Sequence, residues 1–411
     1  MFLESRLERL VERISRKAAI PLRLKLWNGR SFELAPNARV TVAIPAASCL
    51  RYFLSADLNR LGEAYVEGHI EVEGPVHEVF RVAEGFVRHA AEQAKRGRKR
   101  FFLHSRNRDR KAIEHHYDVS NEFYRLFLGE SMVYSCAYYR TGNETLETAQ
   151  EQKLDHILGK LMVRPGERLL DIGCGWGALI VHAAKKYGAV ATGITLSRQQ
   201  YEFARRRILE EGLEGRCEVR LQDYRELSGE GVFDKITSVG MFEHVGLKNL
   251  HTYFDSIRRL LKDGGLALNH GITAADPESR WVGMGAGEFI HRYVFPHGEL
   301  PHISVVLSEM ARAGLEVTDV ESLRRHYART CHEWASRIDA KREYAVAAAS
   351  QKHFRIWQIY LAGCAFGFEH GWMNIYQLLA CKEGALSLDR LPLTREYMYS
   401  RRQPDVRGSR Q

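Results

Sequence analysis

The pattern of hydrophobic and polar positions predicts a small α+β domain over about the first 90 residues. Two alternating segments, Leu22–Trp27 and Arg30–Leu34, flank Asn28-Gly29, a dipeptide typical of a two-residue β-hairpin turn. Further elements are expected in this order: an amphipathic helix at the N-terminus, a strand at Ala38–Ile44, a helix from about Ala56 and a helix over Val76–Arg96. This part carries no chemical motif.

From about residue 112 to 395 the pattern alternates between strands and helices. The expected strands are Arg168–Ile172, Ala189–Thr195, Glu218–Gln222, Lys235–Val239 and Leu266–His270. The expected helices are Ala178–Tyr187, Ser197–Glu211 and Leu250–Leu261. This order is typical of an α/β protein with a doubly wound, mostly parallel, Rossmann-like sheet.

Composition places the chain among globular proteins. Of its 411 residues, 45% are hydrophobic and 27% charged, which excludes global disorder and fibrous architectures. The longest apolar run, Ile359–Phe368, stops at Glu369 and is shorter than the ~18 to 20 residues that a spanning helix needs. The N-terminus lacks the features of a signal peptide, and the 7 cysteines form no CxxC pair, so we expect a cytoplasmic protein with reduced thiols and no structural metal site.

The positive charge is concentrated in one place. The net charge is +9, and the segment Lys95–Lys111, called here the basic segment, holds nine bases and a single acid, Asp109. Phe101, Phe102 and Leu103 interrupt these bases. Three interpretations remain open at this point: a solvated linker, a nucleic-acid patch, or a site for an anionic membrane surface.

A glycine-rich turn follows the first predicted strand of the α/β part. Asp171-Ile172-Gly173-Cys174-Gly175-Trp176-Gly177 ends a strand and opens a helix, which is typical of a nucleotide-binding turn. It fits either a dinucleotide pyrophosphate or the amino acid end of S-adenosylmethionine. The acid that commonly binds a ribose about 20 residues further on is missing, because the second strand ends in Thr195-Leu196-Ser197. Asp171 suits the amino acid end of such a ligand, or is simply a turn acid at a strand end.

Four further strings carry a resemblance to a known family. They are His116-Tyr117-Asp118 to Asn121; Tyr134-Ser135-Cys136-Ala137-Tyr138; Gly240-Met241-Phe242-Glu243-His244-Val245-Gly246; and Arg292-Tyr293-Val294-Phe295-Pro296 with Gly298, Leu300 and Pro301. Together with Leu221–Arg225, they make the chain similar to the cyclopropane-fatty-acyl-phospholipid synthases, S-adenosylmethionine-dependent enzymes with a methyltransferase fold. Leu61-Gly62-Glu63-Ala64-Tyr65 also resembles the family, and favours its full-length bacterial form over the shorter mycolic-acid enzymes.

The resemblance implies a role for each matching position. The residues implied for S-adenosylmethionine are Tyr134, Ser135, Gly173, Gly175, Trp176, Thr195, Leu196 and Gln200, with Asp223 and Tyr224 at the adenine; Asp171 joins them because of its place just before the glycines. The residues implied to hold a catalytic bicarbonate ion are Cys136 and Ile272 through their backbones, with Glu243, His270 and Tyr327. Cys136 has no neighbouring histidine that suggests a Cys-His nucleophile. The aromatic residues from Trp357 to Tyr376 are interpreted as core packing, with lining of an acyl channel as the alternative.

The implied activity is methyl transfer from S-adenosylmethionine to the cis double bond of an unsaturated phospholipid acyl chain, with bicarbonate as the base for ring closure. The alternative within the fold is a methyltransferase that makes methyl- or methylene-branched lipids or methylates a small amine. A nicotinamide oxidoreductase would rest on the glycine-rich turn alone. A nucleic-acid-binding protein would rest only on the basic segment and an isoelectric point near 9.1, without a recognition module.

The expected membrane partner follows from the basic segment and the lipid substrate, and the homodimer follows from the family resemblance. The divisions of the chain follow from its sequence pattern. We expect peripheral association with an anionic phospholipid bilayer at the inner face of the cell membrane, a homodimer, and no nucleic-acid partner. The expected divisions of the chain are an N-terminal α+β domain (1–94), a basic linker (95–111), a catalytic domain (112–395) and a flexible tail (396–411).

Overall fold

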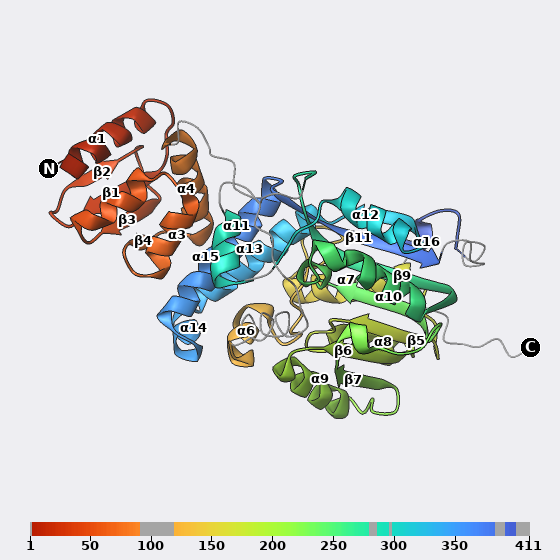
Figure 1. Ribbon diagram of the computed structural model, residues 1–411. Helices are drawn as coiled ribbons and strands as arrows, with labels where there is room; N and C mark the ends of the chain where they lie inside the picture. Colours follow the sequence, from red (N-terminus) through yellow and green to blue (C-terminus); the bar gives the residue numbers. More distant parts are fainter. Residues whose placement is uncertain (1, 91–118, 279–285, 296–297, 383–390, 400–411) are drawn as a thin grey trace, which may run out of the picture. The chain divides into compact units, whose positions relative to one another are not determined.

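The computed structural model describes residues 2–90, 119–278, 286–295, 298–382 and 391–399, which form two compact units (Figure 1). Of these, residues 2–90, 286–295 and 328–372 belong to the first unit, and the other described residues belong to the second. The first unit therefore includes segments that the sequence assigns to the catalytic domain. The basic segment, the string at His116–Asp118 and the expected boundaries at 94 and 111 lie outside the described residues.

The first unit contains a four-stranded sheet in the order β2-β1-β3-β4. Its strands are β1 (Leu22–Leu26), β2 (Ser31–Glu33), β3 (Val40–Ile44) and β4 (Glu71–Glu73). The hairpin predicted at Asn28-Gly29 is confirmed, because β1 and β2 pair antiparallel and Gly29 has a φ of +82°. β1 and β3 run parallel.

Helices from distant parts of the sequence complete the first unit. They are α1 (Phe2–Ser15), α2 (Leu50–Leu54), α3 (Leu58–Val66), α4 (Val76–Ala90), α11 (Ala286–Tyr293), α14 (Arg342–Ala348), α15 (Gln351–Glu369) and α13 (Arg324–Ala340) from residue 328 onward. On α15, Arg355 joins Glu71 in a bidentate ion pair, and Phe366 packs on Phe80 with ring centroids 5.2 Å apart. Trp357, Phe366 and Phe368 are buried, which confirms core packing for these members of the aromatic run.

The second unit contains a seven-stranded sheet in the order β10-β11-β9-β8-β5-β6-β7. Its strands are β5 (Arg168–Ile172), β6 (Val190–Thr195), β7 (Cys217–Leu221), β8 (Phe233–Val239), β9 (Leu261–Ala274), β10 (Leu315–Ser322) and β11 (Met373–Lys382). β11 pairs antiparallel with both neighbours, and the other pairings are parallel. The five predicted strands are confirmed, whereas β10 and β11 are absent from the prediction.

Helices cover both faces of this sheet. They are α6 (Asn121–Leu128), α7 (Leu146–Lys160), α8 (Ala178–Tyr187), α9 (Arg198–Glu210), α10 (Leu250–Leu260), α12 (Ile303–Arg312) and α16 (Glu396–Tyr399). Leu169 packs in one core with α7 and α8, and the next residue, Leu170, packs in another core with α10 and α12. Since neighbouring residues of a strand point to opposite faces, β5 is buried on both sides, as expected for a doubly wound sheet.

None of the described helices is long and apolar enough to cross a membrane. The seven cysteines are all buried thiols.

Candidate active site

A pocket lies at the carboxyl ends of β5, β6 and β8, directly above the glycine-rich turn. Gly173, Gly175 and Gly177 have φ angles of +80°, +54° and +82°, a conformation that other residues rarely adopt. A Cβ at Gly173 would lie 3.0 Å from the Met241 side chain. The turn therefore needs glycine both for its backbone shape and to keep this pocket open.

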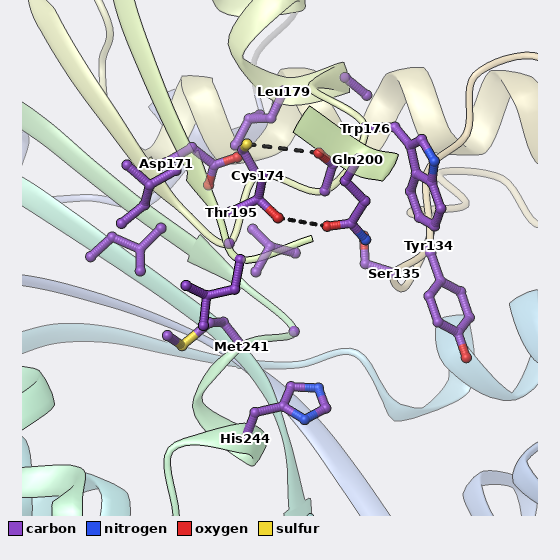
Figure 2. Close-up of a pocket in the computed structure, with 18 of the residues that line it drawn as sticks. Tyr134, Ser135, Asp171, Cys174, Trp176, Leu179, Thr195, Gln200, Met241 and His244 are labelled. Carbon is purple, nitrogen blue, oxygen red and sulfur yellow. Dashed lines mark hydrogen bonds between the residues drawn. The ribbon is translucent and has the colours of Figure 1, made fainter. Parts of the chain in front are cut away.

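All eleven positions implied for the cofactor line this one pocket. They are Tyr134, Ser135, Asp171, Gly173, Gly175, Trp176, Thr195, Leu196, Gln200, Asp223 and Tyr224 (Figure 2 draws several of them). The structure thus brings together residues spread over ninety positions of sequence. Their individual roles toward a ligand remain predictions.

An aromatic wall closes one side of the pocket. The indole nitrogen of Trp176 donates to Oδ1 of Asn121 at 2.8 Å, and its ring packs on Tyr124 with centroids 5.1 Å apart. Asn121 begins α6, where the hydroxyl of Ser120 accepts a hydrogen bond from the N–H of Phe123. A capped helix therefore fixes the orientation of the indole at the pocket.

The end of β6 provides polar side chains in place of the missing acid. Thr195 donates its hydroxyl hydrogen to Oε1 of Gln200 at 2.8 Å (Figure 2). Ser197 caps α9 by accepting from the N–H of Gln200, which places Gln200 in the first turn of that helix. This pair leaves a neutral amide at the edge where a dinucleotide site would carry a carboxylate.

Asp223 lies at the end of β7 and is fixed by its neighbour Arg225. The guanidinium bonds both carboxylate oxygens, with Nε 2.9 Å from Oδ1 and Nη2 2.6 Å from Oδ2. Tyr224 is buried and meets Tyr253 edge to face at 5.4 Å. Arg225 also lines the pocket, and the sequence analysis gave it no role.

Two buried charged groups face the pocket from different elements. The carboxylate of Asp171, at the end of β5, accepts from the hydroxyl of Thr237 at 2.8 Å, and burial raises its pKa to about 6. Lys153, on α7, donates to Oγ of Ser135 at 2.9 Å, and burial lowers its pKa to about 8. Lys153 is absent from the predicted site residues, because its neighbours Glu151, Gln152 and Asp155 are typical of a solvated part of a helix.

Three of the positions implied for bicarbonate meet at β9, because His270 and Ile272 lie on this strand and Glu243 bonds to it. Oε1 of Glu243 accepts from the N–H of Ile272 at 2.6 Å, and His270 lies two residues earlier on the same strand, β9. The second carboxylate oxygen of Glu243 and Nε2 of His270 are both buried without a hydrogen-bond partner. Burial raises the pKa of Glu243 to about 7 and holds the pKa of His270 well below its usual value.

Gln377 on β11 is paired in register with His270 and lies beside its ring. Its amide nitrogen is 3.4 Å from Nδ1 of His270. In this arrangement the amide donates to Nδ1, so the neutral ring carries its proton on Nε2. His270 therefore has a buried N–H donor without a partner, and Glu243 has a buried carboxyl oxygen without one.

Cys136 and Tyr327 meet at one main-chain carbonyl. The oxygen of Leu323 accepts from Sγ of Cys136 at 3.8 Å and from the N–H of Tyr327 at 3.0 Å. The carbonyl oxygen of Ala137, 3.3 Å from Sγ, is a second backbone acceptor near the single thiol hydrogen. This geometry agrees with the interpretation that the sulfur of Cys136 is not a nucleophile.

The loop after β8 connects the two groups. Met241 and His244 line the cofactor pocket, whereas Glu243, between them, reaches β9. The N–H of Gly240 donates to the carbonyl of His270 at 2.7 Å. The two candidate sites are thus neighbours that share one short loop at the carboxyl edge of the sheet.

Comparisons with known proteins agree with this site. The sequence profile of the mycolic acid cyclopropane synthetase family matches residues 104–378, and a domain of unknown function matches residues 10–91. The chain is 47% identical to a probable fatty acid methyltransferase of Pseudomonas putida, over 92% of this chain and 96% of the relative. It is 36% identical to cyclopropane mycolic acid synthase 1 of Mycobacterium tuberculosis, over 66% of this chain and 96% of the relative.

Among solved structures, the mycolic acid cyclopropane synthase CmaA1 complexed with SAH and CTAB superposes with a TM-score of 0.63. It is 35% identical, and the match covers 68% of this chain and 99% of that one. The sheet order, the glycine-rich turn and these similarities define an S-adenosylmethionine-dependent methyltransferase. Within that class, the chain belongs to the mycolic acid cyclopropane synthetase family.

Proposed function

We propose that the protein is a cyclopropane-fatty-acyl-phospholipid synthase. The methyl group of S-adenosylmethionine is added to a cis double bond of an unsaturated acyl chain, and loss of a proton from that methyl group closes the ring. S-adenosylhomocysteine is released, and the lipid gains one CH₂. Since an isolated alkene is a weak nucleophile, the enzyme must align it with the methyl group and exclude water.

The observation that carries this proposal is the pair of buried, unpartnered atoms, Oε2 of Glu243 and Nε2 of His270. An unsatisfied buried polar group costs ~1 to 3 kcal/mol, so such a pair is expected to bind a polar ligand. Bicarbonate fits the donor set, because its hydroxyl can donate to the carboxylate and its oxygens can accept from the imidazole N–H. When bound, it would supply the base that takes the proton lost during ring closure.

The protein's own residues prepare this site. Glu243 is fixed by the N–H of Ile272, and His270 by Gln377. Cys136 and Tyr327 are positioned by the carbonyl of Leu323. The site is buried, which excludes water from the reacting lipid carbons.

A second candidate is methyl transfer without ring closure, giving branched lipids. It is favoured by the similarity to the Pseudomonas relative, which is named a probable fatty acid methyltransferase. Both candidates use the same methyl donor and the same pocket. After methyl transfer, the cation loses a proton in both cases, either with ring closure or without it, and the second course leaves a double bond at the branch.

We further propose that the substrate is taken from a bilayer surface. Moving about ten methylenes out of the membrane costs on the order of 8 kcal/mol at ~0.8 kcal/mol each, unless the protein binds the chain as it leaves. Bases on the protein gain about 1 kcal/mol each near anionic lipid. We therefore assign docking on an anionic bilayer to the basic segment. Separately, the family resemblance leads us to expect that the active form is a homodimer.

The deciding experiment incubates the protein with unsaturated phospholipid vesicles and methyl-labelled S-adenosylmethionine, with and without bicarbonate. Mass spectrometry of the lipids should show a gain of one CH₂, with a ring at the former double bond and a faster reaction with bicarbonate. A methyl or methylene branch without a ring would establish the second candidate. No transfer to lipid would contradict both.

A matched variant tests the assigned base site. Glu243→Gln should reduce ring formation much more than it reduces affinity for S-adenosylmethionine, because Glu243 does not line the donor pocket. Equal losses in both measurements would count against the assignment.

A further inference from the structure

Lys153 is a buried cation without a contacting counter-ion. Its side chain is 2% exposed, and its ammonium donates to the neutral hydroxyl of Ser135 at 2.9 Å. Within the part of the chain that the structure describes, no carboxylate lies within 4.0 Å of Nζ. Lys160, two turns further along α7 and equally buried, instead has Asp319 and Glu321 within 3.0 Å.

The difference between these two lysines indicates different uses. Burying an ammonium ion is unfavourable unless a partner offsets its lost hydration. Lys160 has such partners within the protein. Lys153 faces the donor pocket, where a ligand could provide one.

Asp171 complements Lys153 in the same pocket. It is 3% exposed and comes from the end of β5, whereas Lys153 comes from α7. The two groups do not bond to each other, so each offers its charge to the space that both line. A ligand that carries a carboxylate and an ammonium group on one carbon would match this arrangement.

We propose that Lys153 binds the carboxylate of the methionine moiety of S-adenosylmethionine, while Asp171 holds its ammonium group. This inference rests on the proposed use of the pocket for the methyl donor. It makes Lys153 a binding residue for the amino acid end of the donor.

The competing role is purely structural, with Lys153 serving as a brace for the loop that carries Tyr134 and Ser135. Gln150 has that role already. It lies one turn earlier on the same face of α7, and its amide nitrogen bonds the carbonyl of Ser135 at 2.9 Å and that of Val133 at 3.4 Å. Gln150 does not line the pocket, so it provides a matched control.

The test compares two ligands by isothermal titration calorimetry on the full-length protein. S-adenosylhomocysteine carries the amino acid end, and 5′-methylthioadenosine shares the adenosine and the thioether but lacks that end. Lys153→Met should lower the affinity for S-adenosylhomocysteine at least tenfold and should change the affinity for 5′-methylthioadenosine less than twofold. Gln150→Leu should weaken both ligands by a similar factor.

Two results would overturn the inference: equal weakening of both ligands by Lys153→Met, or no weakening of S-adenosylhomocysteine. If the variant does not fold, the wild-type protein still tests whether the ligand carboxylate is bound. Decarboxylated S-adenosylhomocysteine should bind to it at least tenfold more weakly than the parent compound. Equal affinity of those two compounds would overturn the inference. A wild-type protein that binds no S-adenosylhomocysteine would instead overturn the proposed function.

Discussion

The carboxylate of Glu243 accepts a hydrogen bond from the main-chain N–H of Ile272 at 2.6 Å, which holds an acid in the interior next to β9. Burial raises the pKa of this carboxyl to about 7 from 4.5, although the hydrogen bond acts in the opposite direction. In the unfolded chain, Glu243 ionises at its ordinary pKa of 4.5. In the folded protein, it stays protonated until the pH approaches the raised pKa of about 7. The contribution of this carboxyl to the free energy of unfolding is therefore fully present below pH 4.5 and is lost as the pH rises through 7.

Glu243→Gln should remove this pH dependence. Glutamine keeps the size and an oxygen that can accept from Ile272, but it does not ionise. We expect the thermal midpoint of the variant, relative to wild type, to rise between pH 5 and pH 8, as measured by differential scanning calorimetry. Glu316→Gln, a change at an exposed position on β10, is the control. Its thermal midpoint should differ from that of wild type by the same amount at every pH. If the difference in thermal midpoint between Glu243→Gln and wild type were also constant, the buried acid would not govern stability between pH 5 and pH 8.

Gly271 is required by close packing between β9 and the ring of Phe242. A Cβ at this position would lie 1.7 Å from Cε1 of that ring, and Phe242 is 1% exposed. Gly271→Ala should therefore cost ~1 to 3 kcal/mol of stability and reduce methyl transfer, because Phe242 is next to Glu243. Urea unfolding and the vesicle assay measure the two effects.

Two further variants test this packing argument. Gly159→Ala, on α7, has open space around the new methyl group and should be neutral or stabilise by up to about 1 kcal/mol. Phe242→Leu in the Gly271→Ala background should recover part of the lost stability, because it removes the clashing ring. Additive losses in the double variant would refute a direct clash.

Lys160, itself fully buried, links α7 to β10 through an ionic network. Its ammonium lies 3.0 Å from Asp319 and 2.7 Å from Glu321, and Arg395 bonds the other oxygen of Asp319 at 2.6 Å. Burial alone would raise the pKa of Glu321, but hydrogen bonds from His156 and Lys160 lower it to about 2. Lys160→Met removes the buried cation that the two carboxylates share and should cost ~3 to 5 kcal/mol.

Urea unfolding of Lys160→Met at pH 7 measures this cost. The control is Lys185→Met, which removes an ion pair with Glu211 of 2.6 Å in which the lysine is 62% exposed. That change should cost less than about 1 kcal/mol, because water screens the pair. Similar losses for both lysines would mean that burial does not set the strength of the network.

The sequence predicts the central strands well, because β5 is apolar on both faces and ends in an unambiguous glycine-rich turn. β5 and α8 begin and end at the predicted residues. β10 and β11 escape prediction, since β10 is half-exposed and β11 mixes Asn374 and Gln377 among apolar residues. Hydrophobic periodicity is weak in both strands.

Weak hydrophobic periodicity also explains why some site residues were not predicted from the sequence. The residues Gln150, Lys153, His156 and Lys160 form a polar stripe on α7 that the structure buries. A helix that is polar on its buried face has little contrast between its faces, so its pattern suggests solvent exposure. Only the tertiary fold shows that this stripe contacts the loop at 133–135 and the ionic network. Likewise, the packing of α15 with α4 depends on contacts between residues almost 300 positions apart.

The basic segment gives the last prediction, which concerns where the enzyme works. Arg98→Glu, Lys99→Glu and Arg100→Glu together change the net charge by −6. At about 1 kcal/mol per base near anionic lipid, the triple variant should lose most of its binding to anionic vesicles and at least tenfold of its activity on them. Affinity for S-adenosylmethionine, measured by calorimetry, should stay unchanged.

A second triple variant separates docking from a general effect of charge. Arg205→Glu, Arg206→Glu and Arg216→Glu also change the charge by −6, at exposed positions on or after α9. It should keep most of the activity on anionic vesicles. Raising the salt concentration should weaken wild-type activity on anionic vesicles toward that of the basic-segment variant, since salt screens exposed charges. Unchanged vesicle activity of the basic-segment variant, or equal losses in both triple variants, would contradict docking through residues 95–111.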